Sequence, residues 1–469
     1  MTFSSASFLF MFLPLTAAAY FVCGNRVYRN AVLIAASMLF YLWGGGVKML
    51  LLFLGVTVLG YGAGLLLDSD RLASASALRK AVYIIMLILL LSPLFLFKYL
   101  KFTADNLSAL FGIHGELGQL VLPLGISFYT FQIISYTVDV YRKTVKPEKN
   151  PFRMLLYMSF FPQLVMGPIV RYGEIRDQLS ERRTSIEDIS RGMKRFVVGL
   201  AKKIILANNA AAVAEMIYTG DPAVYGTAMY WVAALSYTLE IYFDFSGYSD
   251  MAVGLGRVFG FRLPENFDHP YTSLSATEFW RRWHITLSGW FRDYVYIPMG
   301  GNRVSRPRWL INIMTVWLLT GLWHGAAWNF VLWGLYYGLM LVLEKLVLGR
   351  LLKKLPEPLA WLWTFAVVNV GWVIFNLTDP AMLTAALKTM FIFRATPWLD
   401  MFAANITITR ALVYLPLGLI CSQPLLRYVK PAETPAGELL QSGCTAVLLI
   451  LCILFLLSST YNPFIYFQF

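Results

Sequence analysis

The chain has 469 residues, of which 58% are hydrophobic, 16% aromatic and only 14% charged. Soluble domains carry about 25% charged residues, so this composition excludes an ordinary soluble fold and predicts an integral membrane protein. The net charge of +13 is spread over short segments between apolar runs, a pattern typical of cytoplasmic loops rather than of nucleic-acid binding. Apolar runs recur throughout, so we expect a single membrane domain over residues 1–469.

About a dozen segments are apolar enough to enter a hydrocarbon core of about 30 Å. In chain order, the expected spans are Phe3–Val22, Asn30–Trp43, Val47–Leu67, Ala81–Tyr99, Gly118–Val140, Met193–Ile217, Thr227–Phe243, Leu310–Trp323, Asn329–Leu348, Leu359–Phe375, Ala411–Leu426 and Thr445–Leu457. Several are shorter than the roughly 20 residues that a straight crossing needs. We therefore predict an all-α polytopic protein with about 11 to 12 transmembrane helices and additional re-entrant or interfacial helices.

Two apolar regions contain helix-breaking or charged residues that are not expected in a simple transmembrane helix. Residues 157–171 contain Pro162, Gly167 and Pro168, which would leave backbone groups unsatisfied in lipid, so this segment should be buried in protein or beside water. Residues 257–308 are apolar but contain several arginines. We expect them to form a re-entrant region that lines the substrate site.

Basic residues in short loops predict the orientation. Arginine and lysine follow the first expected span at residues 26–29 and lie between the third and fourth at residues 71–80. These loops should be cytoplasmic, which places the N-terminus on the extracytoplasmic side. The basic segment 171–203 is either an interfacial amphipathic helix or a solvated cytoplasmic loop.

Common catalytic motifs are missing from the sequence. It contains no Walker A motif, no HExxH and no GxSxG elbow, so nucleotide hydrolysis, zinc proteolysis and α/β-hydrolase chemistry have no local support. The four cysteines show no spacing typical of metal ligands. We expect no metal site.

Two histidines in apolar surroundings, His284 and His324, are half of all the histidines in the chain. An ionisable ring at bilayer depth is costly, so it is usually kept for chemistry or for a polar pathway. The alternative is a purely structural role, in which each histidine is a buried neutral ring that is hydrogen-bonded to a carbonyl. Neutral imidazole can take and return a proton near neutral pH, as a hydroxyl attacking a thioester requires.

The neighbours of the two histidines favour the functional interpretation. His324 lies between Trp323 and Gly325, and Asn329 would follow about one turn later in a continuous helix. The small Gly325 could open room for a substrate beside the ring. His284 lies among Arg281, Arg282 and Asp293, and that carboxylate could pair with a guanidinium.

The run NFDHPYTSLSATEFWRRWHITLSGWFRDYVYIPMGGNR, residues 266–303, is followed by TGLWHGAAWNFVLWG, residues 320–334. Together they closely resemble the membrane-bound O-acyltransferase family, and within it the alginate O-acetyltransferase branch. Supporting similarity extends to FFPQLVMGPIVR, YFDFSGYSDMAVGLGRVFGF and the closing NPFIYFQF. The resemblance implies a ring of helices around a thin centre with a tunnel, and a catalytic core over about residues 121–338.

By that resemblance, His324 is the leading candidate for the general base and His284 is its partner in orienting acceptor or donor. Supporting roles at the site fall to Trp323, Asn329, Asp293 and Arg282. The donor implied is acetyl-CoA, with no bound cofactor. Its phosphates could contact a set of basic side chains on the same segment, namely Arg281, Arg292 and Arg303.

The resemblance also implies partners and a location. The final acceptor is expected to be a cell-surface polysaccharide, reached through an extracytoplasmic SGNH-type serine protein. The chain would be a multi-pass protein of the bacterial cytoplasmic (inner) membrane, in contact with membrane lipids and not with nucleic acid.

Three alternatives remain open at the level of sequence. The first is D-alanyl transfer of the teichoic acid type, with a carrier-protein donor; the run YIPMGGNR favours the polysaccharide branch over it. The second is a haem or metal electron carrier with His284 and His324 as axial ligands. The third is a polysaccharide or lipid transporter in which the histidines relay protons.

Overall fold

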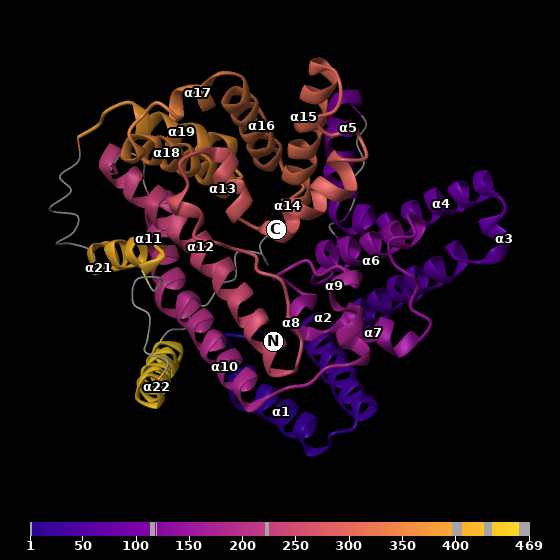
Figure 1. The fold of residues 1–469 in the computed structure, drawn as a ribbon. Helices are drawn as coiled ribbons and strands as arrows, with labels where there is room; N and C mark the ends of the chain where they lie inside the picture. The colour runs from indigo at the N-terminus through magenta and orange to yellow at the C-terminus, as the bar shows by residue number, and fades with distance from the viewer. Residues whose placement is uncertain are drawn as a thin grey trace. The chain divides into compact units, whose positions relative to one another are not determined.

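The computed structural model describes residues 2–112, 118, 120–220, 225–395, 406–425 and 434–458. Within these ranges the regular structure is helical and includes no strand (Figure 1). The prediction of an all-α fold is therefore confirmed, whereas the closing NPFIYFQF run lies outside the described residues. Contacts divide the chain into two compact units, Met1–Phe196 with Met251–Pro264, and Val197–Asp250 with Glu265–Phe469. The single membrane domain stays a prediction.

Six helices in the described residues are long and apolar enough to cross a membrane. They are Arg26–Leu67, Ser76–Phe111, Ile186–Thr219, Trp328–Leu352, Glu357–Asn376 and Pro435–Ser458, and two shorter apolar helices are Phe8–Val22 and Thr409–Cys421. The chain is thus a multi-pass membrane protein.

The first unit is formed by the N-terminal helices. They are η1 (Phe8–Phe12), α1 (Leu13–Val22), α2 (Arg26–Leu67), α3 (Asp70–Ala73), α4 (Ser76–Leu94), η2 (Phe95–Tyr99), α5 (Leu100–Phe111), α6 (Ile126–Tyr141), α7 (Pro151–Ser159), α8 (Phe161–Leu164), α9 (Tyr172–Ser180) and most of α10 (Ile186–Ala201). Helix α2 breaks at Gly46, where φ is 72°, between the two expected spans. The proline-rich segment around α8 is buried, as predicted.

The second unit holds the candidate site. Its elements are η3 (Lys202–Ala207), α11 (Asn208–Thr219), most of α12 (Thr227–Val258), η4 (Pro270–Thr272), α13 (Ala276–Arg282), α14 (Ile285–Phe291), η5 (Arg292–Tyr296), α15 (Arg306–His324), α16 (Trp328–Leu343), η6 (Glu344–Leu348), α17 (Gly349–Leu352), α18 (Glu357–Asn376), α19 (Pro380–Phe391), α21 (Ile406–Cys421) and α22 (Pro435–Ser458).

Helices α15, α16 and α18 pack in sequence, and α13 contacts both α16 and α18 (Figure 1). Two glycines allow α15 and α16 to approach closely. A Cβ on Gly321 would overlap the carbonyl oxygen of Phe330, and a Cβ on Gly334 would overlap that of Trp317. Small residues at a helix crossing bring two backbones together, which here fixes the end of α15 against the start of α16.

Helix α12 is longer than predicted, because it continues past Phe243 to Val258. The acidic residues that follow Phe243 are paired with lysines of η3. Lys203 Nζ lies 2.5 Å from Asp244 Oδ1, with side chains 2% and 1% exposed, and Lys202 Nζ lies 2.7 Å from Asp250 Oδ2, with side chains 23% and 16% exposed. Pairing offsets the cost of burying these charges, so the helix need not end where the apolar run ends.

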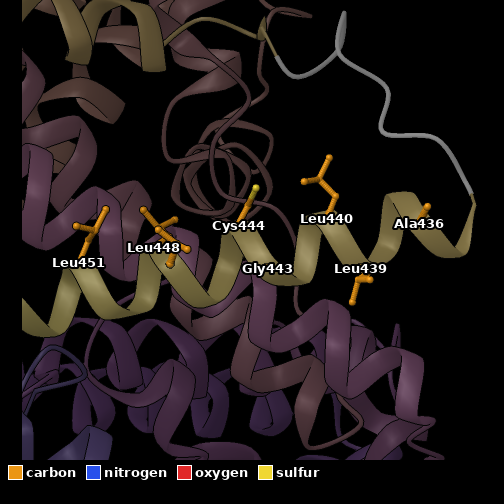
Figure 2. Close-up of a pocket in the computed structure, with 8 residues that line it drawn as sticks. Ala436, Leu439, Leu440, Gly443, Cys444, Leu448 and Leu451 are labelled. Atoms are coloured by element: carbon orange, nitrogen blue, oxygen red, sulfur yellow. The ribbon is translucent and has the colours of Figure 1, made fainter.

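Helix α22 presents an open apolar hollow lined by eight of its own residues. They are Ala436, Leu439, Leu440, Gly443, Cys444, Val447, Leu448 and Leu451, most of which Figure 2 labels along the helix. Large aliphatic side chains of α22 are exposed, including Leu439 at 75% and Leu457 at 72%. This apolar surface suits contact with lipid tails, and the hollow contains no residue of the candidate site.

Candidate active site

His284 lies at the junction of two short helices, α13 and α14. Its backbone is left-handed, with φ 44° and ψ 54°, a region that few residues other than glycine adopt without cost. The loop that begins at Asn266 holds this junction by main-chain hydrogen bonds. Ile285 N donates to Asn266 O at 3.0 Å, and Asp268 N donates to Arg282 O at 2.9 Å. The strained backbone is thus fixed from both sides.

The imidazole of His284 is buried, with 2% of the residue exposed. Its Nδ1 lies 3.1 Å from Asn266 Oδ1, and its Nε2 has no hydrogen-bond partner among the described residues. The Phe245 ring meets it edge-on with centroids 4.6 Å apart. His284 lies outside the six candidate spans, and burial lowers the pKa of its imidazole to about 3. The ring is therefore neutral at physiological pH, with a proton on one nitrogen and a lone pair on the other.

His324 is the last residue of α15 and is 7% exposed. Its ring lies edge-on to Trp333 of α16 and to Phe375 of α18, with centroids 5.1 Å away in both cases. The helix ends here because Gly325 adopts an extended backbone. Three packed helices therefore define the position of this ring.

Two expectations about the surroundings of His324 are wrong. Asn329 does not follow one turn later on the same helix, because the chain breaks after His324 and Asn329 belongs to the first turn of α16. Gly325 does not open room beside the ring, since a Cβ at that position would overlap the side chain of Phe330. The space that the sequence suggested for substrate is filled by an aromatic ring.

Asn329 instead anchors α18. Its Nδ2 donates to the carbonyl oxygens of Phe375 at 2.8 Å and of Ile374 at 3.4 Å. These carbonyls lie in the last turn of α18, where intrahelical donors run out. Because Phe375 also contacts His324, Asn329 supports the site through its neighbour.

Trp323 connects the two histidines. Its ring centroid lies 5.9 Å from that of His284 and 5.0 Å from that of His324, and the residue is 3% exposed. The structure thus brings together three of the residues that the sequence singled out, although His284 and His324 are separated by 40 positions in the chain.

An aromatic cluster surrounds this centre. Trp283 and Trp372 rings lie 4.7 Å apart, Trp280 and Trp333 rings lie 5.4 Å apart, and all four side chains are buried. Such packing excludes water and lowers the local dielectric constant, which strengthens electrostatic interactions with a reacting group.

Two of the charged residues predicted near His284, Arg282 and Asp293, bind partners other than its ring. Arg282 Nη2 lies 2.6 Å from Glu278 Oε1, and its Nη1 donates to Thr272 Oγ1 at 3.0 Å. Asp293 does bind a guanidinium, that of the adjacent Arg292, through two contacts of 2.6 and 3.1 Å. These pairs leave the imidazole of His284 to its amide and aromatic neighbours.

The three arginines proposed for phosphate contact, Arg281, Arg292 and Arg303, are exposed. Arg281 lies in the last turn of α13 and Arg292 begins η5. Arg303 lies farther along, in the turn between η5 and α15, where its backbone N–H donates to Gly300 O at 3.1 Å. Among the described residues, the hydrogen bonding of His284 involves none of these arginines. Contact of Arg281, Arg292 and Arg303 with CoA stays a prediction.

Sequence reasoning missed Asn266, Phe245, Trp333 and Phe375 as neighbours of the histidine rings. Asn266 opens the NFDHP run, 18 residues before His284. Its neighbours include Glu265 and Asp268, so a polar residue at this position gives no distinct signal. The aromatic residues give none either, because aromatic residues make up 16% of the chain.

The chain matches one protein family model and is similar to several named bacterial proteins. Residues 145–384 match the family model described as MBOAT, membrane-bound O-acyltransferase family. The chain is 39% identical to the probable alginate O-acetylase AlgI of Pseudomonas aeruginosa, over 93% of this chain and 84% of that protein. It is 35% identical to the peptidoglycan O-acetyltransferase of Helicobacter pylori, over 83% and 79%. A teichoic acid D-alanyltransferase of Bacillus subtilis is 29% identical over 61% and 75%.

Proposed function

We propose that this chain, which belongs to the membrane-bound O-acyltransferase family, moves an acetyl group from acetyl-CoA toward an extracytoplasmic polysaccharide. Its class as an O-acyltransferase follows from the family and from the O-acetyltransferase names of its relatives. The observation that carries the proposal for the site is the shared contact of His284 and His324 with Trp323.

Acyl transfer from a thioester to a hydroxyl requires a general base and a site that excludes water. A hydroxyl attacks the thioester carbonyl, the carbon–sulfur bond breaks, and the hydroxyl proton passes to a base before it reaches the leaving thiolate. We assign His324 the role of general base and His284 that of orienting acceptor or donor. Imidazoles buried among aromatic rings suit this work, since a neutral ring can accept a proton and return it.

The proposed topology carries the acetyl group across the membrane. Acetyl-CoA would bind on the cytoplasmic side, where the exposed Arg281, Arg292 and Arg303 could hold its phosphates. An SGNH-type partner outside would receive the group and pass it to the polymer, with the chain in the bacterial inner membrane and its N-terminus facing out. Support comes from two relatives whose names specify O-acetylation of alginate and of peptidoglycan.

The alternative within the family is D-alanyl transfer. Two relatives with that name are 29% and 28% identical and match 61% and 54% of this chain. Five relatives named as probable alginate O-acetylases are 37–41% identical and match 84–100% of it. Greater similarity over more of the chain favours acetyl transfer.

The test is acetyl transfer from radiolabelled acetyl-CoA in membranes, with and without the candidate SGNH-type partner. Three proteins are compared: wild type, His324→Ala and the control His269→Asn. His269 Nδ1 lies 3.3 Å from the Ser422 carbonyl, and asparagine suits its left-handed backbone. We expect label on partner or glycan with wild type and His269→Asn only. Equal transfer by folded His324→Ala would refute the base assignment. Absence of label with every partner, and transfer from a D-alanyl carrier protein, would favour the alternative.

A further inference from the structure

The amide group of Asn266 has one possible orientation in this structure. Its Oδ1 faces the backbone N–H of Thr286 at 3.3 Å and the Thr286 hydroxyl at 2.9 Å, while its Nδ2 lies 3.2 Å from Ser249 Oγ. A backbone N–H can only donate. The atom that faces it must therefore be the amide oxygen, which excludes the flipped amide.

This orientation determines which nitrogen of His284 carries the proton. Nδ1 lies 3.1 Å from the same Asn266 Oδ1. Two lone pairs cannot form a hydrogen bond, so Nδ1 must be protonated and must donate to the amide oxygen. In a neutral ring, Nε2 then carries the lone pair. Nε2 is buried without a partner among the described residues, where an additional proton would have no acceptor.

We propose that Asn266 is a positioning residue that holds His284 in the Nδ1–H tautomer, so that Nε2 accepts a hydrogen bond from an O–H or N–H group of bound substrate. The inference rests on the proposed acyl transfer. The tautomer fixes the direction of hydrogen bonding at His284. Nε2 accepts a hydrogen bond from an O–H or N–H group, and it does not donate one to the oxyanion that develops on the thioester carbonyl.

The main chain of Asn266 also contacts the His284 junction. Asn266 holds the α13–α14 junction with its carbonyl oxygen, which accepts from Ile285 N, and holds the ring with its side chain. One residue thus fixes both the left-handed backbone of His284 and the tautomer of its imidazole. Removal of the side chain alone leaves the main-chain hydrogen bond in place, so the two effects can be separated by substitution.

The first test is the protonation state of His284, measured by NMR on the full-length protein in detergent with ¹⁵N-labelled histidine. The chain has four histidines, and His284→Gln identifies the signal of interest. At pH 8 we expect a neutral ring with protonated Nδ1 in wild type and in Ser249→Ala, which removes the other partner of the same amide. Asn266→Leu should lose this signature. A protonated Nε2 in wild type, or an unchanged tautomer in Asn266→Leu, would overturn the proposal.

The second test is the pH dependence of acetyl transfer. Asn266→Leu should lower kcat roughly 100-fold with little change in KM for acetyl-CoA, because a misplaced ring affects the chemical step. Asn266→Asp retains an acceptor for Nδ1–H and should recover much of kcat. Its charge favours the imidazolium form and should move the acidic limb of the pH profile upward by about 1–3 units. Equal loss of kcat in both variants, with an unshifted profile, would contradict a positioning role.

The two tests separate this inference from the proposed function. If the tautomer is as expected and no variant transfers acetyl groups from any donor, the proposed function fails while the assignment of the tautomer stands. If transfer occurs and the NMR signature is reversed, the function stands and the role of Asn266 is refuted.

Discussion

The buried ion pair between Lys203 and Asp244 should be far more sensitive to loss of one partner than to loss of both. Coulomb's law with an effective dielectric constant of about 20 gives an attraction of about 7 kcal/mol for unit charges 2.5 Å apart. Desolvation costs several kcal/mol for each ion and offsets most of this. Asp244→Leu or Lys203→Met leaves the remaining charge buried without this partner, so each should lower the unfolding free energy by about 3–5 kcal/mol.

The double variant Lys203→Met/Asp244→Leu removes both desolvation costs together with the attraction. Its unfolding free energy should therefore lie within about 1 kcal/mol of the wild-type value or above it, because apolar replacement of a buried ion pair is often neutral or stabilising. A matched control exists on the same two segments. Lys202 and Asp250 form a pair of similar length, 2.7 Å, but they are partly exposed, so Lys202→Met or Asp250→Leu should cost about 1 kcal/mol or less.

The assay is thermal and chemical unfolding of the purified protein in detergent, with wild type and the single and double variants of both pairs in one series. For Lys203 and Asp244, we expect the double variant to lose much less stability than the sum of the two single losses. For Lys202 and Asp250, the losses of the single variants should be nearly additive. If the double variant of the buried pair loses as much stability as its two single variants combined, burial of a charge that has lost this partner does not explain the effect. Equal costs for Asp244→Leu and Asp250→Leu would also refute it.

Three further predictions concern the support of the site. Gly325→Ala should cost about 1–3 kcal/mol, because the added methyl overlaps the Phe330 ring; the cost should fall in a Phe330→Leu background, and an equal cost there would exclude this contact. Asn329→Leu should lower the unfolding free energy by about 1–3 kcal/mol, because it removes the hydrogen bond to the buried Phe375 carbonyl; an unchanged melting temperature would contradict this. The same variant should reduce acetyl transfer, because Phe375 contacts the His324 ring. Glu344 accepts from the first two amides of α13 at 2.7 and 3.0 Å; Glu344→Gln should cost about 1 kcal/mol, measured by unfolding, and no change would mean that this charge does not stabilise α13.

The sequence was sufficient for what depends on local pattern. Long apolar runs marked the six helices that are long and apolar enough to cross a membrane, but other expected spans, such as Gly118–Val140 and Thr227–Phe243, are not among these six in the described residues. The gap between the expected spans that end at Trp43 and begin at Val47 coincides with the break in α2. Hydropathy ends helix α12 too early because it treats Asp244 and Asp250 as costs. Their neutralising lysines lie more than 40 positions away, on η3. Partners of that kind are invisible to a window that moves along the chain.

The candidate site was predictable in its centre and not in its surroundings. His284, His324 and Trp323 stood out by residue type and by resemblance to a family, and they meet in the structure. Asn266 and Phe375 reach the rings only through tertiary packing, the first by a loop that pairs with the α13–α14 junction and the second by α18. Their roles require coordinates, because nothing in their local sequence indicates what lies beside them.

The left-handed backbone of His284 also governs which substitutions can report on its ring. Histidine, asparagine and aspartate adopt this conformation more readily than other residues with side chains, and β-branched residues adopt it with most strain. Replacement by valine would disturb the fold of the junction and the chemistry at once, and alanine would mix the two in part. Asparagine keeps the backbone preference while it removes the imidazole, so His284→Asn is the variant whose lost activity can be assigned to the ring itself.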